Sequence, residues 1–138
     1  MVSSDIVRMA DKLSRRVQSA VVGNQEAEQQ DLLGPSGSMV LLALSEMKSA
    51  PLYRLVQRVG RDKSQITRVV KSLVAQGLVN REVCRDDRRV IRLRLTDAGL
   101  AKVASLHATI DHVVDDVLVS LSGHEREQLR RLLLKVQL

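Results

Sequence analysis

Polar side chains that can read base edges recur at helical spacing within residues 63–76. Gln65 and Arg68 are three residues apart and would therefore share one face of a helix. Glutamine can form paired hydrogen bonds with adenine, and arginine with guanine, on their major-groove edges. The accompanying polar residues, which suit contacts to bases or phosphates, are Lys63, Ser64, Thr67, Lys71 and Ser72. This pattern predicts a helix that enters the major groove of duplex DNA; the alternative is a solvated helix face.

Arginine is also concentrated in a short segment between two strand-like runs, residues 78–84 and 90–95. The second run alternates apolar and charged residues, which is typical of a half-buried strand. We predict that Arg89 enters an adjacent minor groove, because narrow A·T-rich grooves attract arginine, and that Asp87 braces it or shapes the turn. The alternative is that Arg89 forms a salt bridge with its own lobe. Contacts to the DNA backbone are predicted for the two remaining arginines, Arg85 and Arg88.

The positive charge of the chain lies in this same region. The 138 residues have a formal net charge of +6. Residues 51–95 hold 12 Lys and Arg against 4 Asp and Glu, a net charge of +8, whereas the remainder of the chain is net −2. A basic patch of this kind indicates a polyanionic partner, since solvated surfaces usually mix their signs. We therefore expect nucleic acid to be the partner.

Composition excludes several other classes of protein. Tyr53 is the only aromatic residue, so the base-stacking platforms of single-strand binders cannot be built and duplex DNA is favoured. No apolar run suits a membrane span or a secretory signal, and a single cysteine fits a reducing compartment. The expected location is the cytoplasm, without membrane contact. Because no nucleophile elbow, P-loop, dinucleotide-binding or zinc-protease motif occurs, we expect neither catalysis nor a cofactor.

Hydrophobic periodicity and helix-ending residues predict a mainly α fold with a small β-hairpin. Gly23-Asn24 is expected to end the first helix, residues 25–31 to be loop or frayed helix, and Gly34–Gly37 to break the chain again. Gly60, Asp62 and Gly77 are expected to cap the helices on either side of the turn, and Ser122 with Glu125 to form a capping box. The predicted helices are 4–22, 39–47, 51–59, 63–76, 97–121 and one that starts after Ser122.

The first and last helices carry apolar stripes that are too large for so small a body to cover. Ile6 and Met9 continue the stripe of the first helix, and the long helix from Asp97 has an aliphatic face along most of its length. The most economical arrangement is a two-fold dimer in which the terminal helices of two chains interleave. In the last helix the residues predicted to be buried are Leu129, Leu132, Leu133 and Val136.

Several of these motifs together resemble the MarR family of bacterial winged helix-turn-helix transcriptional regulators. They are GRDKSQITR at residues 60–68, the following helix that ends in AQGLV, and the segment DDRRVIRLRLTDAG. The family's D-x-R-x-x-x-L-x-L-T wing pattern is matched by Asp87, Arg89, Leu93, Leu95 and Thr96. The chain departs from the family in having Lys71 where many members have an acidic residue, and in lacking a wing proline.

The resemblance implies a homodimeric regulator, most often a repressor, that leaves a palindromic double-stranded operator when a small ligand or an oxidant alters the dimer. It implies that residues 1–35 and 97–138 form a helical dimerisation lobe and that residues 36–96 form a winged helix-turn-helix lobe. An effector pocket would lie between the two lobes. The residues placed there by position are Met9, Leu13, Arg16, Met39, Leu42 and Tyr53.

Other interpretations remain open from the sequence. The chain could be a non-specific architectural DNA-binding protein, or a winged helix that binds RNA or docks on protein. Cys84 lies near arginines that would lower a thiol pKa, so a redox-responsive regulator is an alternative to a bystander cysteine. His107 and Asp111 are four residues apart, as are His112 and Asp116, so a metal-responsive regulator is a further alternative to a solvated helix face.

Overall fold

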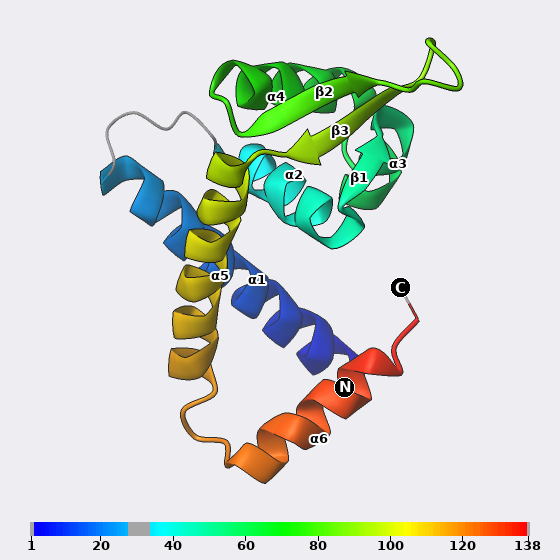
Figure 1. The fold of residues 1–138 in the computed structure, drawn as a ribbon. Coiled ribbons are helices and arrows are strands. Elements are labelled where there is room, and N and C mark those ends of the chain that lie inside the picture. The colour runs from blue at the N-terminus through cyan, green and yellow to red at the C-terminus, as the bar shows by residue number, and fades with distance from the viewer. Residues whose placement is uncertain (1, 28–33, 138) are drawn as a thin grey trace.

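The computed structural model describes residues 2–27 and 34–137 of the chain, which form two lobes (Figure 1). One lobe contains α2, α3, α4 and the β-sheet, and the other is formed by α1, α5 and α6 (Figure 1). The elements are α1 (Val2–Ala27), α2 (Gly34–Met47), β1 (Ser49–Pro51), α3 (Leu52–Val59), α4 (Lys63–Ala75), β2 (Val79–Val83), β3 (Ile91–Leu95), α5 (Asp97–Val117) and α6 (Gly123–Leu134). The predicted mainly α class with a small β component is confirmed.

The β component is a three-stranded antiparallel sheet rather than a hairpin alone. Its strand order is β1-β3-β2, and Ala50 of β1 pairs with Leu93 of β3. The strand β1 was not predicted, because three residues ending in Pro51 are too short to show an alternating pattern. Pro51 has no backbone N–H, and it is tolerated here because β1 lies at the edge of the sheet.

The helix caps predicted from the sequence are present in the structure. Gly60 adopts a left-handed conformation with φ 68° and donates its N–H to the carbonyl of Val56, which ends α3. Asp62 then caps the start of α4, and Gly77 has φ 74° just after the helix ends. The predicted capping box of α6 is also present, with Ser122 and Glu125 each accepting from the other's backbone N–H.

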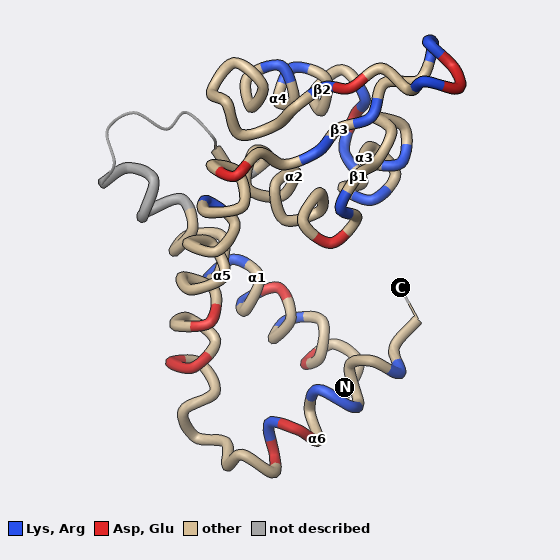
Figure 2. The backbone as a smooth tube through the Cα atoms, viewed as in Figure 1, with Lys and Arg blue, Asp and Glu red and all other residues tan. Residues whose placement is uncertain are grey.

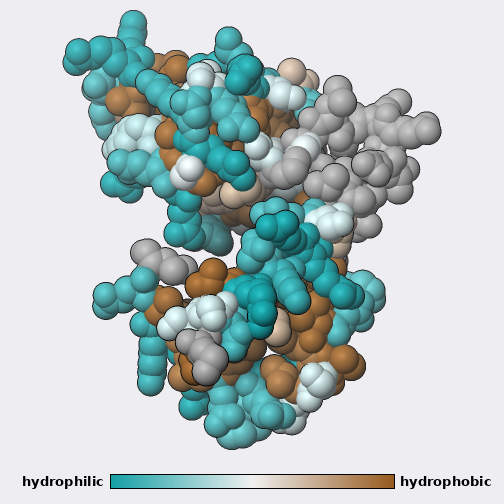
Figure 3. All heavy atoms as spheres, turned by 180° about the vertical axis from the view of Figure 1, so that it is seen from behind, coloured by the Kyte–Doolittle hydropathy of each residue, from teal (hydrophilic) through white to brown (hydrophobic). Residues whose placement is uncertain are grey.

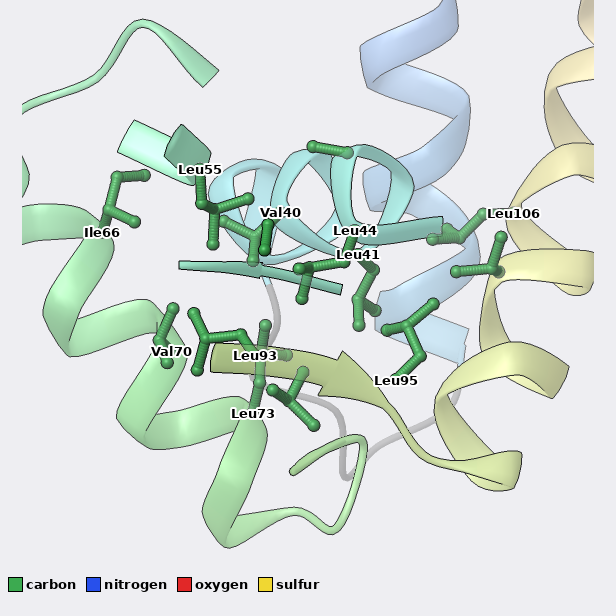
Figure 4. Packing of buried hydrophobic residues seen from close by; sticks show 14 of the residues in the cluster. Val40, Leu41, Leu44, Leu55, Ile66, Val70, Leu73, Leu93, Leu95 and Leu106 are labelled. Atoms are coloured by element: carbon green, nitrogen blue, oxygen red, sulfur yellow. The ribbon is translucent and has the colours of Figure 1, made fainter. Parts of the chain in front are cut away.

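The core of the lobe that contains the sheet lies where α2, α3 and α4 pack against the sheet's inner face (Figure 4). Aliphatic side chains fill it, as the near absence of aromatic residues requires. Those with 0 to 1% exposure include Leu41, Leu44, Leu55, Ile66, Leu73 and Leu93. This core extends into the other lobe through Val21 of α1 and Val103 and Leu106 of α5, so one buried cluster joins the two lobes.

Three predicted helix boundaries are wrong. The helix α1 continues through Gly23-Asn24 to Ala27, and α2 begins at Gly34 rather than after the Gly34–Gly37 cluster. Glycine weakens a helix by about 1 kcal/mol relative to alanine, an amount that tertiary packing readily overrides. Residues 28–31 of the predicted loop lie outside the described residues. The helix α5 ends at Val117, before the predicted Leu121.

The predicted burial of the last helix is wrong for a single chain. No residue of α6 is buried, and Leu132, Leu133 and Val136 are 55 to 61% exposed, while Leu129 is half-buried. At the other end of the chain, Ile6 is 64% exposed. Apolar residues are correspondingly visible on the surface of the lower lobe (Figure 3). Among the described residues, no helix is both long and apolar enough to cross a membrane.

Candidate nucleic-acid interface

The start of α4 is fixed by Asp62, whose carboxylate accepts hydrogen bonds from the backbone N–H groups of Ser64 (3.1 Å) and Gln65 (3.2 Å). The Ser64 hydroxyl also donates to this carboxylate. The hydroxyl bond, followed by the backbone bond from Gln65, holds the pKa of Asp62 below its ordinary value. The carboxylate is therefore ionised at neutral pH, and its negative charge interacts favourably with the positive end of the helix dipole. The first turn of α4 is thus set by charge and capping rather than by burial.

The two faces of α4 differ sharply. Ile66, Val70 and Leu73 are buried against the lobe, with 0 to 4% exposure. Arg68 and Lys71 project from the opposite face, and the structure gives neither side chain a hydrogen bond or ion pair among the described residues. The other exposed polar residues predicted for this face are Lys63, Ser64 and Ser72. Figure 2 shows the cations of α4 along the top of the lobe, on the same side as the arginine-rich tip.

The side chains of Gln65 and Thr67 already form hydrogen bonds within the chain, which the sequence pattern did not indicate. The side chain of Gln65 is half-buried, and its Nε2 donates to Ser36 Oγ of α2 at 3.2 Å. Thr67 Oγ1 donates to the carbonyl of Lys63 at 2.8 Å, as threonines within helices commonly do. A base contact by Gln65 would require it to give up its bond to Ser36. The sequence offered no signal for that bond, because its partners are 29 residues apart.

The arginine-rich tip is a wing that projects beyond the sheet (Figures 1 and 2). Its turn is closed by Cys84 N–H donating to Val90 O (2.9 Å) and Val90 N–H donating to Asp87 O (3.0 Å). The Asp87 carboxylate accepts from the backbone N–H of Arg89 at 3.0 Å and lies 3.4 Å from its Nε. The Arg89 side chain is 92% exposed, and its ion pair within the described structure is to Asp87 of the wing itself. Arg85 and Arg88 are also exposed.

Arg81 is a cation that the sequence reasoning missed. It follows Val79 by two residues on β2 and stands opposite Leu93, so strand alternation places it on the α4 side of the sheet. Together with Thr67 and Lys71 it lines a hollow of about 70 Å³ between α4 and the hairpin. The alternation along β2 was the signal that could have found it.

The residues predicted for an effector pocket lie on three helices, α1, α2 and α3. Met9, Leu13 and Arg16 lie on α1, and of these Leu13 is half-buried. Met39 and Leu42 are half-buried on α2. Tyr53 is 60% exposed on α3, in the other lobe from α1 (Figure 1).

The residues behind the redox and metal alternatives are also placed. Cys84 is half-buried at the base of the wing. His107 and Asp111 are exposed on α5, and His112 Nε2 lies 3.8 Å from an Asp116 carboxylate oxygen. Within the described residues, no group of three His, Cys, Asp or Glu side chains is arranged to hold a metal ion.

A short helix, a second helix with an exposed polar face, and a three-stranded sheet with an arginine tip define the winged helix-turn-helix class of fold. Comparison with known proteins narrows the class. Residues 36–91 match the model of the MarR family. Residues 36–91, which run from α2 to the start of β3, therefore carry a domain of the MarR family.

Solved structures agree in fold over nearly the whole chain. Wild-type MarR from E. coli in its apo form matches with a TM-score of 0.81 and 20% identity, covering 100% of this chain and 97% of that one. A cysteine-to-serine mutant of the E. coli protein in complex with operator DNA matches with a TM-score of 0.73, 21% identity and coverage of 97% and 94%. A probable transcriptional regulator from Pseudomonas aeruginosa matches with a TM-score of 0.71, 25% identity and coverage of 98% of both chains.

Proposed function

We propose that this chain is a sequence-specific regulator that binds double-stranded DNA as a homodimer, and that it is a repressor released by a small-molecule effector. The observation that carries the DNA-binding part is the exposed face of α4, where the side chains of Arg68 and Lys71 have no hydrogen bond or ion pair among the described residues. The Arg89 side chain extends from the neighbouring wing at 92% exposure. A helix and a loop so placed suit adjacent major and minor grooves. The solved complex of the E. coli relative with operator DNA supports this assignment.

The homodimer is supported by apolar surface that the single chain leaves uncovered. Leu133 and Leu134 of α6 are 61% and 71% exposed, and Ile6 and Val7 of α1 are 64% and 68% exposed. Within the chain, α6 is held through Arg126, which pairs with Asp115 (2.8 Å) and donates to the Leu118 carbonyl (3.0 Å). Uncovered apolar surface of this kind marks an interaction site. We assign it to a second copy of the chain, with residues 1–35 and 97–138 as the dimerisation lobe and residues 36–96 as the DNA-binding lobe.

A two-fold dimer would present two copies of α4 to successive major grooves, which requires a palindromic operator. An effector that changes the spacing of the two helices would weaken binding to both half-sites together, and this is the proposed route of release. A regulator of this kind acts in the cytoplasm.

Fluorescence anisotropy tests the proposal. The full chain is titrated at moderate salt into duplex DNA from the region beside its own gene and into a scrambled duplex. We expect tight binding to the native duplex alone. Equal and salt-sensitive binding to both duplexes would contradict sequence-specific recognition of this region and favour the architectural alternative, because phosphate contacts carry no sequence information.

Variants of α4 separate the roles of its two exposed cations. Arg68→Ala should weaken binding by about 5- to 150-fold and relax the sequence preference, as expected for the loss of a bidentate base contact. Lys71→Ala should weaken native and scrambled duplexes alike and reduce the salt dependence by about one released counterion. Arg15→Ala is the matched control, because Arg15 is exposed on α1 and its ion pair in the described structure is with Asp11. Equal effects of the control and the α4 variants would contradict the assignment of α4.

A further inference from the structure

The first turn of α2 is joined to the first turn of α4 by one side-chain hydrogen bond. Gln65 Nε2 donates to Ser36 Oγ at 3.2 Å, although the two residues are 29 positions apart in the sequence. The two helices pack against each other in the lobe that contains the sheet (Figure 1). Both side chains are half-buried, whereas the capping bonds to Asp62 and the hydroxyl bond of Thr67 are exposed. Partial burial strengthens such a bond, because water competes for it less.

The backbone of Gln65 is fixed independently of this bond. Its N–H donates to the Asp62 carboxylate at 3.2 Å, and α4 continues from there to Ala75. Only the side-chain torsions can therefore move the amide from Ser36 to the exposed face of α4. These torsions occupy separate staggered wells, so the amide is found in one position or the other. The structure shows the position held against α2, and a contact with adenine requires the position turned outward.

Arg68, which lies one turn further along α4, is not held in this way. Its side chain is exposed and has no hydrogen bond or ion pair among the described residues. It can therefore contact a phosphate or a guanine as soon as the protein meets DNA. Gln65 must first lose an existing bond, and adenine replaces that bond with two. The two residues predicted to read bases thus differ in what they require of the DNA.

We propose that Ser36 is a positioning residue for DNA recognition, which holds Gln65 away from the bases unless adenine stands at the matching position. This inference rests on the proposed sequence-specific binding of duplex DNA. On a site without that adenine, Gln65 stays on Ser36, and Arg68 and the phosphate contacts bind the DNA. On a site with it, the bond to Ser36 is given up. Ser36 therefore lowers the affinity for the matching site and leaves the affinity for other sites unchanged.

A scan of single base pairs identifies the position that Gln65 reads. Each base pair of the native duplex is replaced in turn, and the wild type and Gln65→Ala are titrated by anisotropy. Replacement of the adenine should weaken binding by the wild type about 5- to 150-fold, and binding by Gln65→Ala less than about twofold. If no position shows this difference, Gln65 reads no base and the proposal is overturned. A wild type that binds native and scrambled duplexes equally would overturn the proposed function itself, so the two failures are distinguishable.

A double-mutant cycle then tests the role of Ser36. On the native duplex, Ser36→Ala should bind about 2- to 12-fold more tightly than the wild type, the range expected for one hydrogen bond. On the duplex that lacks the adenine, its affinity should be unchanged. In the Gln65→Ala background the same substitution should have no effect on either duplex, because no amide remains to be held. Unchanged or weaker binding of Ser36→Ala to the native duplex, or an equal effect with and without Gln65, would refute the role.

Ser45→Ala is the matched control, because Ser45 is a half-buried serine at the other end of the same helix. It should bind both duplexes as the wild type does. Tightening by Ser45→Ala equal to that by Ser36→Ala would show a general effect of α2 and contradict the assignment.

The side-chain amide of Gln65 reports its position directly. In ¹H–¹⁵N NMR of the DNA-free full chain, its Nε2 resonances should shift in Ser36→Ala and stay in place in Ser45→Ala. Addition of the scrambled duplex to the wild type should leave them in the held position, and addition of the native duplex should move them. Movement on both duplexes alike would count against the proposal, because Gln65 would then leave Ser36 without the matching adenine.

Discussion

Substitution of Gly99 by alanine should destabilise the protein, although glycine-to-alanine changes within helices usually stabilise by about 0.5–1 kcal/mol. Gly99 is buried in the first turn of α5, and a Cβ at this position would lie 2.1 Å from the backbone oxygen of Leu78. It would also lie 3.2 Å from Cδ2 of Leu95. Ordinary contacts between such atoms are about 3.5 Å, so α5 must move away from Leu78 by about 1 Å. A backbone carbonyl cannot give way by changing rotamer, and such overpacking costs about 1–3 kcal/mol.

Urea denaturation at fixed protein concentration measures this effect, because dimer stability depends on concentration. Gly99→Ala should lower the free energy of unfolding by about 1–3 kcal/mol. Gly123→Ala is the matched control, since Gly123 is also in the first turn of a helix but has no atom within 4 Å of the added Cβ. The control should be neutral or stabilised by up to about 1 kcal/mol. If Gly99→Ala gains stability as the control does, α5 is not in close contact with Leu78 and the reasoning is wrong.

Three further predictions follow from the caps, the wing and the uncovered surface. Asp62→Ala should lower the melting temperature at neutral pH but not at low pH. The pKa of Asp62 is lowered in the folded protein, so its carboxylate stabilises the fold above the unfolded-state pKa, and this stability is lost as pH falls through the folded-state pKa. Thermal unfolding between about pH 2 and 6 measures this, and the melting temperature of Asp62→Asn, which keeps a capping oxygen, should vary less with pH. Arg89→Ala should weaken operator binding by about tenfold in anisotropy without changing the dimer mass, and unchanged affinity would remove the minor-groove assignment. Leu133→Asp should give the mass of a single chain by light scattering with its helical circular dichroism retained, since this side chain is 61% exposed within the chain, and a persistent dimer would contradict the interface.

The features predicted correctly from the sequence depend on neighbours within a few residues. Gly60 ends α3, Asp62 caps α4, and Ser122 and Glu125 form a capping box, because each motif satisfies backbone groups one turn away. Helical spacing alone likewise assigns Ile66, Val70 and Leu73 to one face of α4, and all three are buried.

The features that were missed depend on partners far along the chain. Ser49–Pro51 becomes a strand only because β3, more than 40 residues later, offers it an edge to pair with. The helix α1 passes through Gly23 although glycine is a poor helix former, and local propensity is a weak guide where packing decides. Leu132 and Leu133 follow a helical pattern that predicts burial, but no described part of the single chain covers them.

The connection between the lobes shows how a change in the dimer could reach the DNA-binding helix. Thr96 Oγ1 donates to the carbonyl of Gly77, just after α4, at 2.5 Å, and accepts the N–H of Gly99 in α5 at 3.0 Å. The Thr96 N–H donates to the Leu78 carbonyl at 3.1 Å, the same carbonyl against which Gly99 packs. Thr96 thus links the turn after α4 to the start of α5 through two side-chain hydrogen bonds. Since α5 belongs to the lobe proposed to dimerise, a rotation of α5 against its partner must carry the end of α4 with it. An effector therefore need not touch α4 to change the spacing of the two helices.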